Sequence, residues 1–292
     1  MAVVLTQHSY GKSRVRLTKV QRHADRHELA EWSLDVRLGG DFAAAYSAGD
    51  NRTVVATDTM KNVVYALARD HALAAPEDFA LTLARHFRDS YPQVASTTIH
   101  ISVEPWQRVE VCGRPHPHAF AGGAPGRRTC SVTLTRDGQQ IGAGIDGLPL
   151  LKTTDSAFRG FHRDAYTTLP DADDRIMATD LTADWLYAGA AAIDWDACYK
   201  QVRRALVETF AGHKSLGVQQ TLHAMGTAAL AACPAVGQIT LTMPNRHRLL
   251  VNLAPLGRDN PNAVFVTTDE PFGVITGTLR RSGAGSRRFA EA

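Results

Sequence analysis

Lysine is scarce in this sequence, and the net charge is small. The 292 residues carry a net charge of +3, which is too little to predict a surface that binds nucleic acid or a membrane. Arginine is abundant, but lysine occurs only at Lys12, Lys19, Lys61, Lys152, Lys200 and Lys214. A buried lysine can lose its proton whereas an arginine stays charged, so the few lysines are the more interesting cations.

Closely spaced cysteines and long apolar runs are absent as well. Four cysteines without a CxxC motif are interpreted as reduced thiols of a cytosolic protein: Cys112, Cys130, Cys198 and Cys233. The opening MAVVLTQHSYGK lacks the regions of a secretory signal. No stretch reaches the roughly 18 apolar residues of a spanning helix. With 44% apolar residues, we expect a globular cytoplasmic protein with a substantial core.

The first half alternates between the two main periodicities. Residues 13–21 and 28–38 alternate apolar with polar, which predicts strands with one wet face. Residues 58–71 and 77–90 have helical spacing instead. Strands are predicted next in ASTTIHISVEPW and RVEVC. After a Gly/Pro/His-rich loop that begins at 112, two further strands are expected to meet at Asp137-Gly138, which is a hairpin signal.

The second half repeats this order. A strand at 174–181 precedes helices at about 194–211 and 216–232, and GQITLTM, RLLVNL and AVFVTT are predicted to be the closing strands. VVATDT and IMATDL occupy the same place in the two halves. The repeated order indicates a duplicated unit.

We therefore predict an α+β fold with two helices on one face of an antiparallel sheet in each half. The first unit is expected to span 1–145 and the second 146–282, with a disordered tail at 283–292. Each unit leaves sheet edges uncovered, which favours an oligomer in which a site is shared between chains.

The triplet Thr57-Asp58-Thr59 stands between an apolar run and a helical pattern. Such side chains accept hydrogen bonds from the first N–H groups of a helix, so capping is their common role. A hydroxyl and a carboxylate at a strand-to-helix junction also suit ligand binding. The residues alone leave both interpretations open.

Residues 150–175 combine aromatic side chains with arginine in a polar segment. Phe158 and Phe161 lie close together, and Arg175 ends the segment. An aromatic face and a guanidinium fork suit a flat, anionic heterocycle. The alternative is that both rings belong to the core and that Arg175 pairs with Asp173 or Asp174.

Two shorter segments carry polar groups that suit a ligand. MPNRH places Asn245 and His247 on the same face of a strand end, where they hold a small polar ligand or form a solvated turn. GVQQT begins a helix, at which Val218 offers a backbone N–H and Gln219 an amide. An uncapped helix start with an exposed glutamine is the alternative.

One set of residues has the chemistry of a zinc site, namely Cys112, His116, His118 and Cys130. Its spacing matches no strong zinc pattern, so we expect no metal. The Gly-rich AFAGGAPGRR precedes a strand rather than a helix, which is not the context of a phosphate loop. No dinucleotide, hydrolase or metalloprotease motif occurs, and no cofactor is expected.

Five segments resemble, in order, those of the urate oxidase (uricase) family: YGKSRVR, VVATDTMKN, LKTTDSAFRGFHRDAYTTLPDADDRIMATD, VQQTL and MPNRH. The match spans nearly the whole chain. The resemblance implies the T-fold, which is a duplicated α+β unit that assembles into a tunnel-shaped homotetramer. It also implies a cofactor-free enzyme that converts urate, dioxygen and water to 5-hydroxyisourate and hydrogen peroxide.

The resemblance assigns the substrate contacts to matching positions. Arg175 and Gln219 would hold opposite edges of the urate anion, with Phe158 stacked beneath it. Val218 would donate its backbone N–H, and Asp58 would donate its own from the neighbouring subunit.

The resemblance assigns proton transfer and oxygen binding to four other positions. Lys12 and Thr57 would form a proton-relay dyad that His247 extends, with Thr57 supplied by the neighbouring subunit. Asn245 would hold the oxygen and later the attacking water. A threonine hydroxyl is a poor base alone, and a lysine shielded from water can accept its proton.

Three rival functions remain. A zinc-dependent cyclohydrolase acting on a pterin would need the Cys/His set and an anchoring glutamate, which the matched segments do not supply. A non-catalytic purine-binding protein would have lost Lys12 or Thr57, and both are present. A purely structural tunnel would leave the five segments unexplained. The ending FAEA lacks a peroxisomal Ser-Lys-Leu signal, so a bacterial-type cytoplasmic enzyme is expected.

Overall fold

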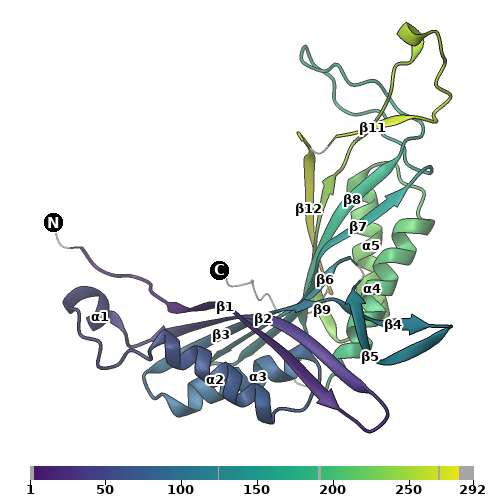
Figure 1. Cartoon of the computed structure of the whole chain (residues 1–292). Coiled ribbons are helices and arrows are strands. Elements are labelled where there is room, and N and C mark those ends of the chain that lie inside the picture. The colour runs from purple at the N-terminus through teal and green to yellow at the C-terminus, as the bar shows by residue number, and fades with distance from the viewer. Residues whose placement is uncertain (1–2, 124, 190–191, 269, 283–292) are drawn as a thin grey trace. The chain divides into compact units, whose positions relative to one another are not determined.

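The computed structural model describes residues 3–123, 125–189, 192–268 and 270–282 (Figure 1). The chain divides into two compact units, Met1–Gly144 and Ile145–Ala292. The tail predicted at 283–292 lies outside the described residues. In the described ranges, no helix is long and apolar enough to cross a membrane.

The first unit contributes antiparallel strands in the order β1-β2-β3-β6. Helices α2 and α3 cover one face of these strands (Figure 1). Two smaller elements accompany them: a short helix α1 and a separate hairpin of β4 and β5. The bounds are β1 (Tyr10–Arg22), β2 (His27–Gly40), α1 (Ala43–Ala48), α2 (Thr57–Asp70), α3 (Pro76–Ser90), β3 (Val94–Glu104), β4 (Trp106–Val111), β5 (Arg114–Gly122) and β6 (Arg127–Thr135).

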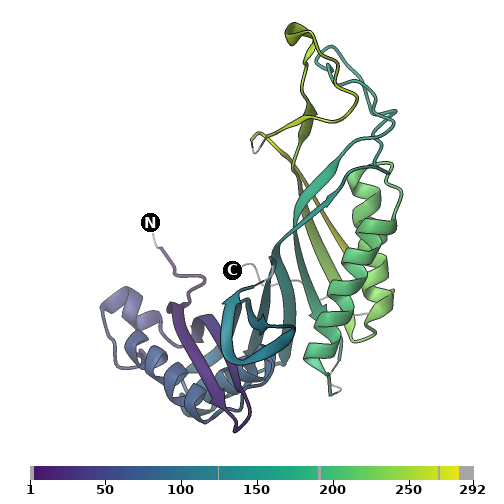
Figure 2. The same ribbon diagram turned by 45° about the vertical axis from the view of Figure 1, so that its right-hand side comes forward.

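The second unit repeats this plan with strands in the order β7-β8-β9-β12. Helices α4 and α5 lie side by side along one face of these strands (Figure 2). A small sheet of β10 and β11 interrupts the chain between β9 and β12. The bounds are β7 (Gln139–Lys152), β8 (Met177–Tyr187), α4 (Trp195–Gly212), α5 (Val218–Ala232), β9 (Val236–Asn245), β10 (Arg248–Leu250), the 3₁₀ helix η1 (Ala254–Leu256), β11 (Phe265–Thr267) and β12 (Gly273–Arg280).

The predicted α+β class and duplicated order are confirmed, with two corrections to the strands. RLLVNL and AVFVTT do not close the second sheet, because β12 pairs with β9 while β10 and β11 pair with each other. The segment predicted as a loop at 112–120 is largely strand β5, paired with β4. Both insertions occur at the same place in their units, after the strand that follows the pair of long helices, α2 and α3 or α4 and α5.

Alternating side chains explain why these segments form a helix-covered sheet. In β2, every second residue from Trp32 to Leu38 is buried. Trp32 stacks on Phe79 of α3 at 5.3 Å between ring centroids. Trp185 of β8 is equally buried in the second unit. Burial of each large side chain contributes about 1.5–3 kcal/mol, so these strands and helices stabilise each other.

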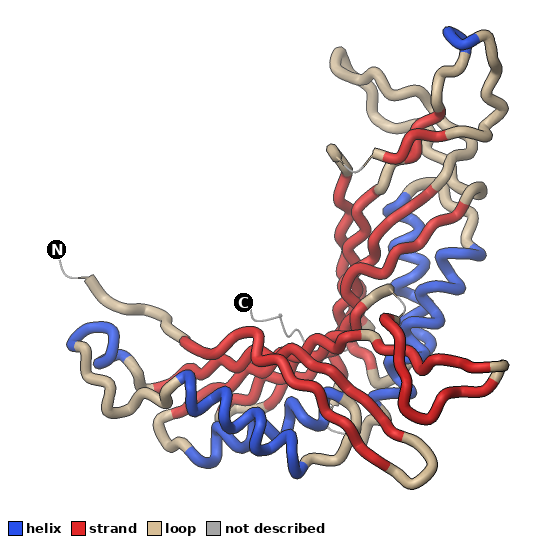
Figure 3. Tube along the Cα trace, in the orientation of Figure 1, coloured by secondary structure: helices blue, strands red, loops and turns tan. Residues whose placement is uncertain are grey.

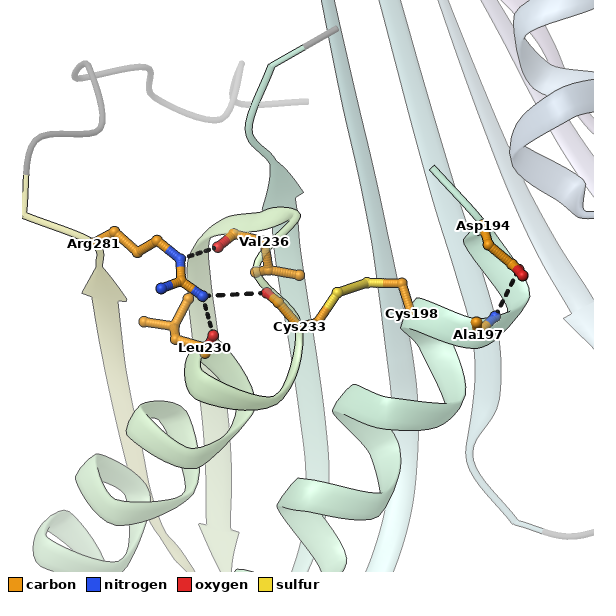
Figure 4. The surroundings of a disulfide bond; sticks show 7 residues. All are labelled: Asp194, Ala197, Cys198, Leu230, Cys233, Val236 and Arg281. Atoms are coloured by element: carbon orange, nitrogen blue, oxygen red, sulfur yellow. Dashed lines mark hydrogen bonds between the residues drawn. A yellow bond between two sulfur atoms is a disulfide. The ribbon is translucent and has the colours of Figure 1, made fainter. Parts of the chain in front are cut away.

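The prediction that all cysteines are reduced is wrong. Cys198 and Cys233 form a disulfide with Cα atoms 5.8 Å apart (Figure 4). They are separated by 35 positions in the sequence, but the pairing of α4 with α5 brings the start of one helix to the end of the other. Among the described residues, Cys112 and Cys130 are free thiols, the first exposed and the second buried.

Loss of this disulfide should lower the stability of the second unit. A crosslink that closes a loop of this length contributes about 2–4 kcal/mol to the free energy of unfolding, in the chain-entropy model. We expect the double variant Cys198→Ala/Cys233→Ala to unfold at a lower temperature than the parent chain in thermal scans. Cys112→Ala is the control, because this thiol is exposed and free. An unchanged transition in the double variant would contradict the disulfide's stabilising role.

Asp184 makes stability depend on pH. Burial, assisted by the nearby charge of Asp146, raises the pKa of Asp184 from 3.8 to about 6. The folded chain therefore binds this proton more tightly than the unfolded chain, so the group costs stability above about pH 6 and this cost disappears as the pH falls towards 4. The difference corresponds to at most about 3 kcal/mol.

We expect Asp184→Asn to raise the unfolding temperature at pH 8 and to have a smaller effect at pH 5. Thermal scans between these values measure the difference directly. Asp259→Asn, at an exposed position of the same unit, should change neither value. An equal shift of Asp184→Asn at both pH values would show that the carboxylate is not the titrating group.

Candidate active site

The predicted site residues fall into two groups, one in each unit. Lys12, Thr57 and Asp58 belong to the first unit. The second unit carries the remaining six: Phe158, Arg175, Val218, Gln219, Asn245 and His247.

Lys12 lies in β1, opposite Val36 of β2, where a β-bulge begins. The residue before it must be glycine, because a Cβ atom on Gly11 would lie 1.8 Å from the Val36 carbonyl oxygen. Bulges re-aim the side chains beside them. The Tyr-Gly-Lys sequence therefore sets the position of this lysine through the backbone.

Tyr10 connects β1 to the segment that leads into α2. Its hydroxyl accepts a hydrogen bond from the Val55 N–H at 2.8 Å and donates one to the Val55 carbonyl at 3.0 Å. Burial raises the pKa of Tyr10, which favours the protonated hydroxyl that this double contact requires. Thr57 begins α2 only two residues further on. The tyrosine therefore holds Thr57 in a fixed relation to the strand that carries Lys12.

Capping by the Thr57-Asp58-Thr59 triplet, one of the two interpretations of this segment, does not occur. The N-cap of α2 is Ala56, and no side chain caps it. Thr57 is the first helical residue and is exposed. This hydroxyl is available for a role other than capping.

Asp58 lies in the first turn of α2, where a negative charge suits the helix dipole. Its carboxylate accepts hydrogen bonds from Lys61 at 2.5 Å and Asn62 at 3.0 Å. The Lys61 contact is the main cause of the lowered pKa of Asp58, and the charge of Lys12 adds a weaker effect of the same sign. Lys12 and the start of α2 therefore lie close enough for their charges to interact.

In the second unit, the segment between β7 and β8 and the excursion between β9 and β12 form long loops at the same end (Figure 3). The first of these loops is held to the residues before α5. Ala157 N–H donates to the Ser215 carbonyl at 2.8 Å, and Ser215 N–H donates to the Asp155 carbonyl at 2.9 Å. These bonds bring the β7–β8 loop to the N-terminus of α5.

Phe158 and Arg175 lie together in this loop. The rings of Phe158 and Phe161 are stacked at 4.8 Å, nearly parallel. The guanidinium carbon of Arg175 is 5.1 Å from the centre of the Phe158 ring, a distance at which cation–π attraction operates. Neither ring is fully buried, so the core alternative for these phenylalanines is not supported.

The ion-pair alternative for Arg175 is not supported either. Asp173 pairs with Arg159 instead, and Asp174 accepts hydrogen bonds from Thr154 and Ser156. Among the described residues, no carboxylate forms a salt bridge with Arg175. Burial is the cause of the lowered pKa of Arg175. A half-buried guanidinium that no acid compensates is a place where an anion would bind.

The N-terminus of α5 completes this cluster. Val218 is buried at the first helical position, and Gln219 is exposed beside it. Gly217 lies between the two parts of the cluster, since a Cβ atom there would be 3.6 Å from Oε1 of Gln219 and 3.8 Å from the Phe158 ring. The first N–H groups of a helix have no intrahelical acceptor and bind anions. Amide, aromatic face and helix N–H groups therefore meet at one place.

Asn245 ends β9, and His247 follows just beyond it. The Arg246 N–H donates to the Ala178 carbonyl at 2.8 Å, and the Arg246 guanidinium contacts Asp180 at 2.8 Å. These contacts place the end of β9 beside the start of β8. Because Arg175 lies two residues before the start of β8, the amide and the imidazole lie at the same end of the sheet as the guanidinium.

The alternative zinc set does not come together. Among the residues that the structure describes, no group of three or more His, Cys, Asp or Glu side chains is arranged to hold a metal ion. Cys112 is exposed between β4 and β5, whereas Cys130 is buried in β6. His116 and His118 are close, with ring centres 4.6 Å apart.

Sequence reasoning missed Tyr10 and Asp174, which hold the two groups in place. Tyr10 directly precedes the Gly-Lys pair, but a lone tyrosine gives no signal of its partner 45 positions away. Asp174 was considered only as a partner for Arg175. Its donors lie 18 and 20 positions earlier, a separation that has no local periodicity.

Known proteins of one family resemble this chain over nearly its whole length. A sequence model of the uricase family matches residues 8–133 and 141–276. The uricase of Arthrobacter globiformis is 44% identical over 97% of this chain and 91% of that protein. Uricase-2 of Phaseolus vulgaris is 38% identical over 93% of this chain and 94% of that protein.

Solved structures give the same result. The crystal structure of uricase from Arthrobacter globiformis superimposes with a TM-score of 0.94 at 43% identity, covering 99% of this chain and 98% of that one. A uricase structure from Bacillus fastidious, at 22% identity and a TM-score of 0.82, shares the fold. The chain belongs to the uricase family.

Proposed function

We propose that the protein oxidises urate with dioxygen and water to 5-hydroxyisourate and hydrogen peroxide, without a cofactor. The observation that carries this proposal is the half-buried guanidinium of Arg175, which lies against the Phe158 ring and has no carboxylate partner among the described residues. Membership of the uricase family supports the same substrate.

In this proposal, the second unit binds the substrate. Arg175 pairs with one edge of the urate anion, and the amide of Gln219 binds the opposite edge. The Val218 N–H donates to the ring at the positive end of the α5 dipole. Phe158 stacks beneath the ring. Together these groups fix the plane of the substrate, and such positioning contributes several kcal/mol to catalysis.

The first unit supplies the Lys12 and Thr57 dyad of the proton relay in this proposal. Thr57 removes a proton from the urate anion and passes it to Lys12, and His247 extends the relay. Asp58 adds a backbone N–H. In the proposed homotetramer, Thr57 and Asp58 of one subunit act on urate bound by its neighbour. The lowered pKa of Asp58, to which Lys12 contributes, supports the pairing of these two segments within a chain.

The chemistry follows from the substrate. Doubly deprotonated urate is electron-rich, so it transfers two electrons to dioxygen, which takes up two protons and leaves as hydrogen peroxide. Water then adds a hydroxyl group at the oxidised carbon and releases a proton to the relay. Asn245 holds the oxygen, and afterwards the water, over one face of the ring. The cytoplasmic location and the tetramer stay predictions.

The direct test follows three reactants at once. Chelator-treated protein is mixed with urate in aerated buffer, and urate absorbance, oxygen and peroxide are recorded together. We expect one oxygen consumed and one peroxide formed for each urate lost. If urate binds without being consumed, the chain is a binding protein. If urate neither binds nor reacts, the next experiment tests pterins as substrates, with zinc added.

A further inference from the structure

Asp174 closes the β7–β8 loop on itself. Its carboxylate accepts a hydrogen bond from the Thr154 hydroxyl at 2.6 Å and one from the Ser156 N–H at 3.1 Å. The backbone N–H groups of Asp155 and Arg175 add further contacts. The donors at 154–156 begin the loop, and Asp174 ends it. One carboxylate therefore joins the two ends of the segment.

The residues that form the anion site lie inside or next to this closure. Phe158 and Ala172 exchange two backbone hydrogen bonds, at 2.8 and 3.0 Å, just within the closed ends. Arg175 follows Asp174 directly in the sequence. The contact of the Arg175 guanidinium with the Phe158 ring at 5.1 Å thus spans two points that the carboxylate ties together.

The hydrogen bonds of the Asp174 carboxylate also determine whether Arg175 forms an ion pair with it. Asp174 is its neighbour in the chain and would be the nearest acid to pair with it. Because Thr154 and Ser156 engage the carboxylate, it stays directed into the loop. The same bonds, Thr154 first, lower the pKa of Asp174, so the carboxylate remains ionised and engaged through the neutral pH range. The guanidinium is left for an outside anion.

We propose that Asp174 is a positioning residue, which closes the β7–β8 loop and so holds Arg175 and Phe158 in the geometry that binds a planar anionic heterocycle. This inference rests on the proposed function for its ligand class. The closure of the loop itself is a claim about the chain alone, and it can be tested without any ligand.

The kinetic test compares two neighbouring aspartates. Asp174→Ala should raise the KM for urate about 10- to 100-fold, the effect of a misplaced binding group, while kcat changes much less. Asp174→Asn keeps one acceptor oxygen and should give an intermediate KM. Asp173→Asn is the matched control, because this exposed carboxylate pairs with the exposed Arg159 and not with Thr154 or Ser156. Xanthine, an oxopurine close in shape to urate, should compete most weakly in Asp174→Ala, less weakly in Asp174→Asn, and as well as in the parent chain in Asp173→Asn.

A ligand-free measurement separates the two proposals. Amide hydrogen exchange at Phe158 and Ala172 should become faster in Asp174→Ala and Thr154→Val, but not in Asp173→Asn. Unchanged exchange in both variants would overturn the loop closure, whatever the enzyme does. Faster exchange with an unchanged KM would show that closure does not position Arg175. A parent chain that neither oxidises urate nor binds xanthine would contradict the proposed function, and the exchange data would still decide the loop closure.

Discussion

Replacing Lys12 with methionine is expected to lower kcat for urate by about 10²–10⁴-fold, the usual contribution of a positioned proton acceptor. Methionine is an unbranched side chain one atom shorter than lysine, and it cannot take a proton from Thr57. Urate binding should persist, because the side chains proposed to hold the ring belong to the second unit. The backbone N–H of Asp58, the one binding group proposed in the first unit, is not altered by this substitution. Steady-state kinetics combined with xanthine displacement distinguishes loss of turnover from loss of binding.

Thr57→Ala should have a similar effect, and the double variant Lys12→Met/Thr57→Ala should be little worse than the more damaged single variant. Groups that act in one relay are not additive. Lys200→Met is the control, since this lysine is exposed on α4. If the two single effects multiply in the double variant, the residues act independently and the relay is wrong. Full activity of Lys12→Met would exclude the lysine from proton transfer altogether.

Replacing Arg175 with alanine is expected to impair binding rather than turnover. Removal of one partner of a desolvated charge pair costs about 2–5 kcal/mol, so the KM for urate should rise by about 30-fold or more. The guanidinium is half-buried and has no carboxylate partner among the described residues. Its loss therefore removes charge from the site without leaving an unpaired acid behind.

Two further arginine variants show what the site requires. Arg175→Lys keeps the charge but loses the planar fork. If the fork matters more than the charge, its KM should be raised as much as that of Arg175→Ala. Arg159→Ala, on the same loop, is the control, because its side chain is 60% exposed and pairs with Asp173 at the surface. An equal rise in KM for Arg175→Ala and Arg159→Ala would mean that the loop, rather than this guanidinium, sets the affinity.

Most helices and strands of this protein could be predicted from the sequence, because periodicity is a local property. The pattern at 58–71 predicts α2, which spans Thr57–Asp70, and the alternation at 28–38 predicts most of β2. The sheet edges were less predictable. The closing strand β12 was missed because the short apolar runs of β10 and β11 precede it and carry the same strand signal.

The chemistry of the site was visible as residue types but not as contacts. The aromatic and cationic side chains of 150–175 and the polar triplet at 57–59 were identifiable as a ligand-binding set. Whether Arg175 was free to bind an anion was not. Two acids stand directly before it in the chain, and sequence proximity predicts an ion pair that the folded loop does not form.

The amino-acid sequence was enough to identify the family, the duplicated order of helices and strands, and the residues that carry the proposed chemistry. The helices and strands follow from local periodicity, and the family and its residues follow from short sequence segments that resemble those of known members. Three contacts become visible in the folded chain alone: Cys198 with Cys233, Tyr10 with Val55, and the Asp174 carboxylate with Thr154 and Ser156 rather than with the Arg175 guanidinium. Each of these contacts joins positions 18 or more residues apart in the sequence. Contacts of this kind depend on how the helices, strands and loops pack, and the local periodicity of a sequence does not predict them.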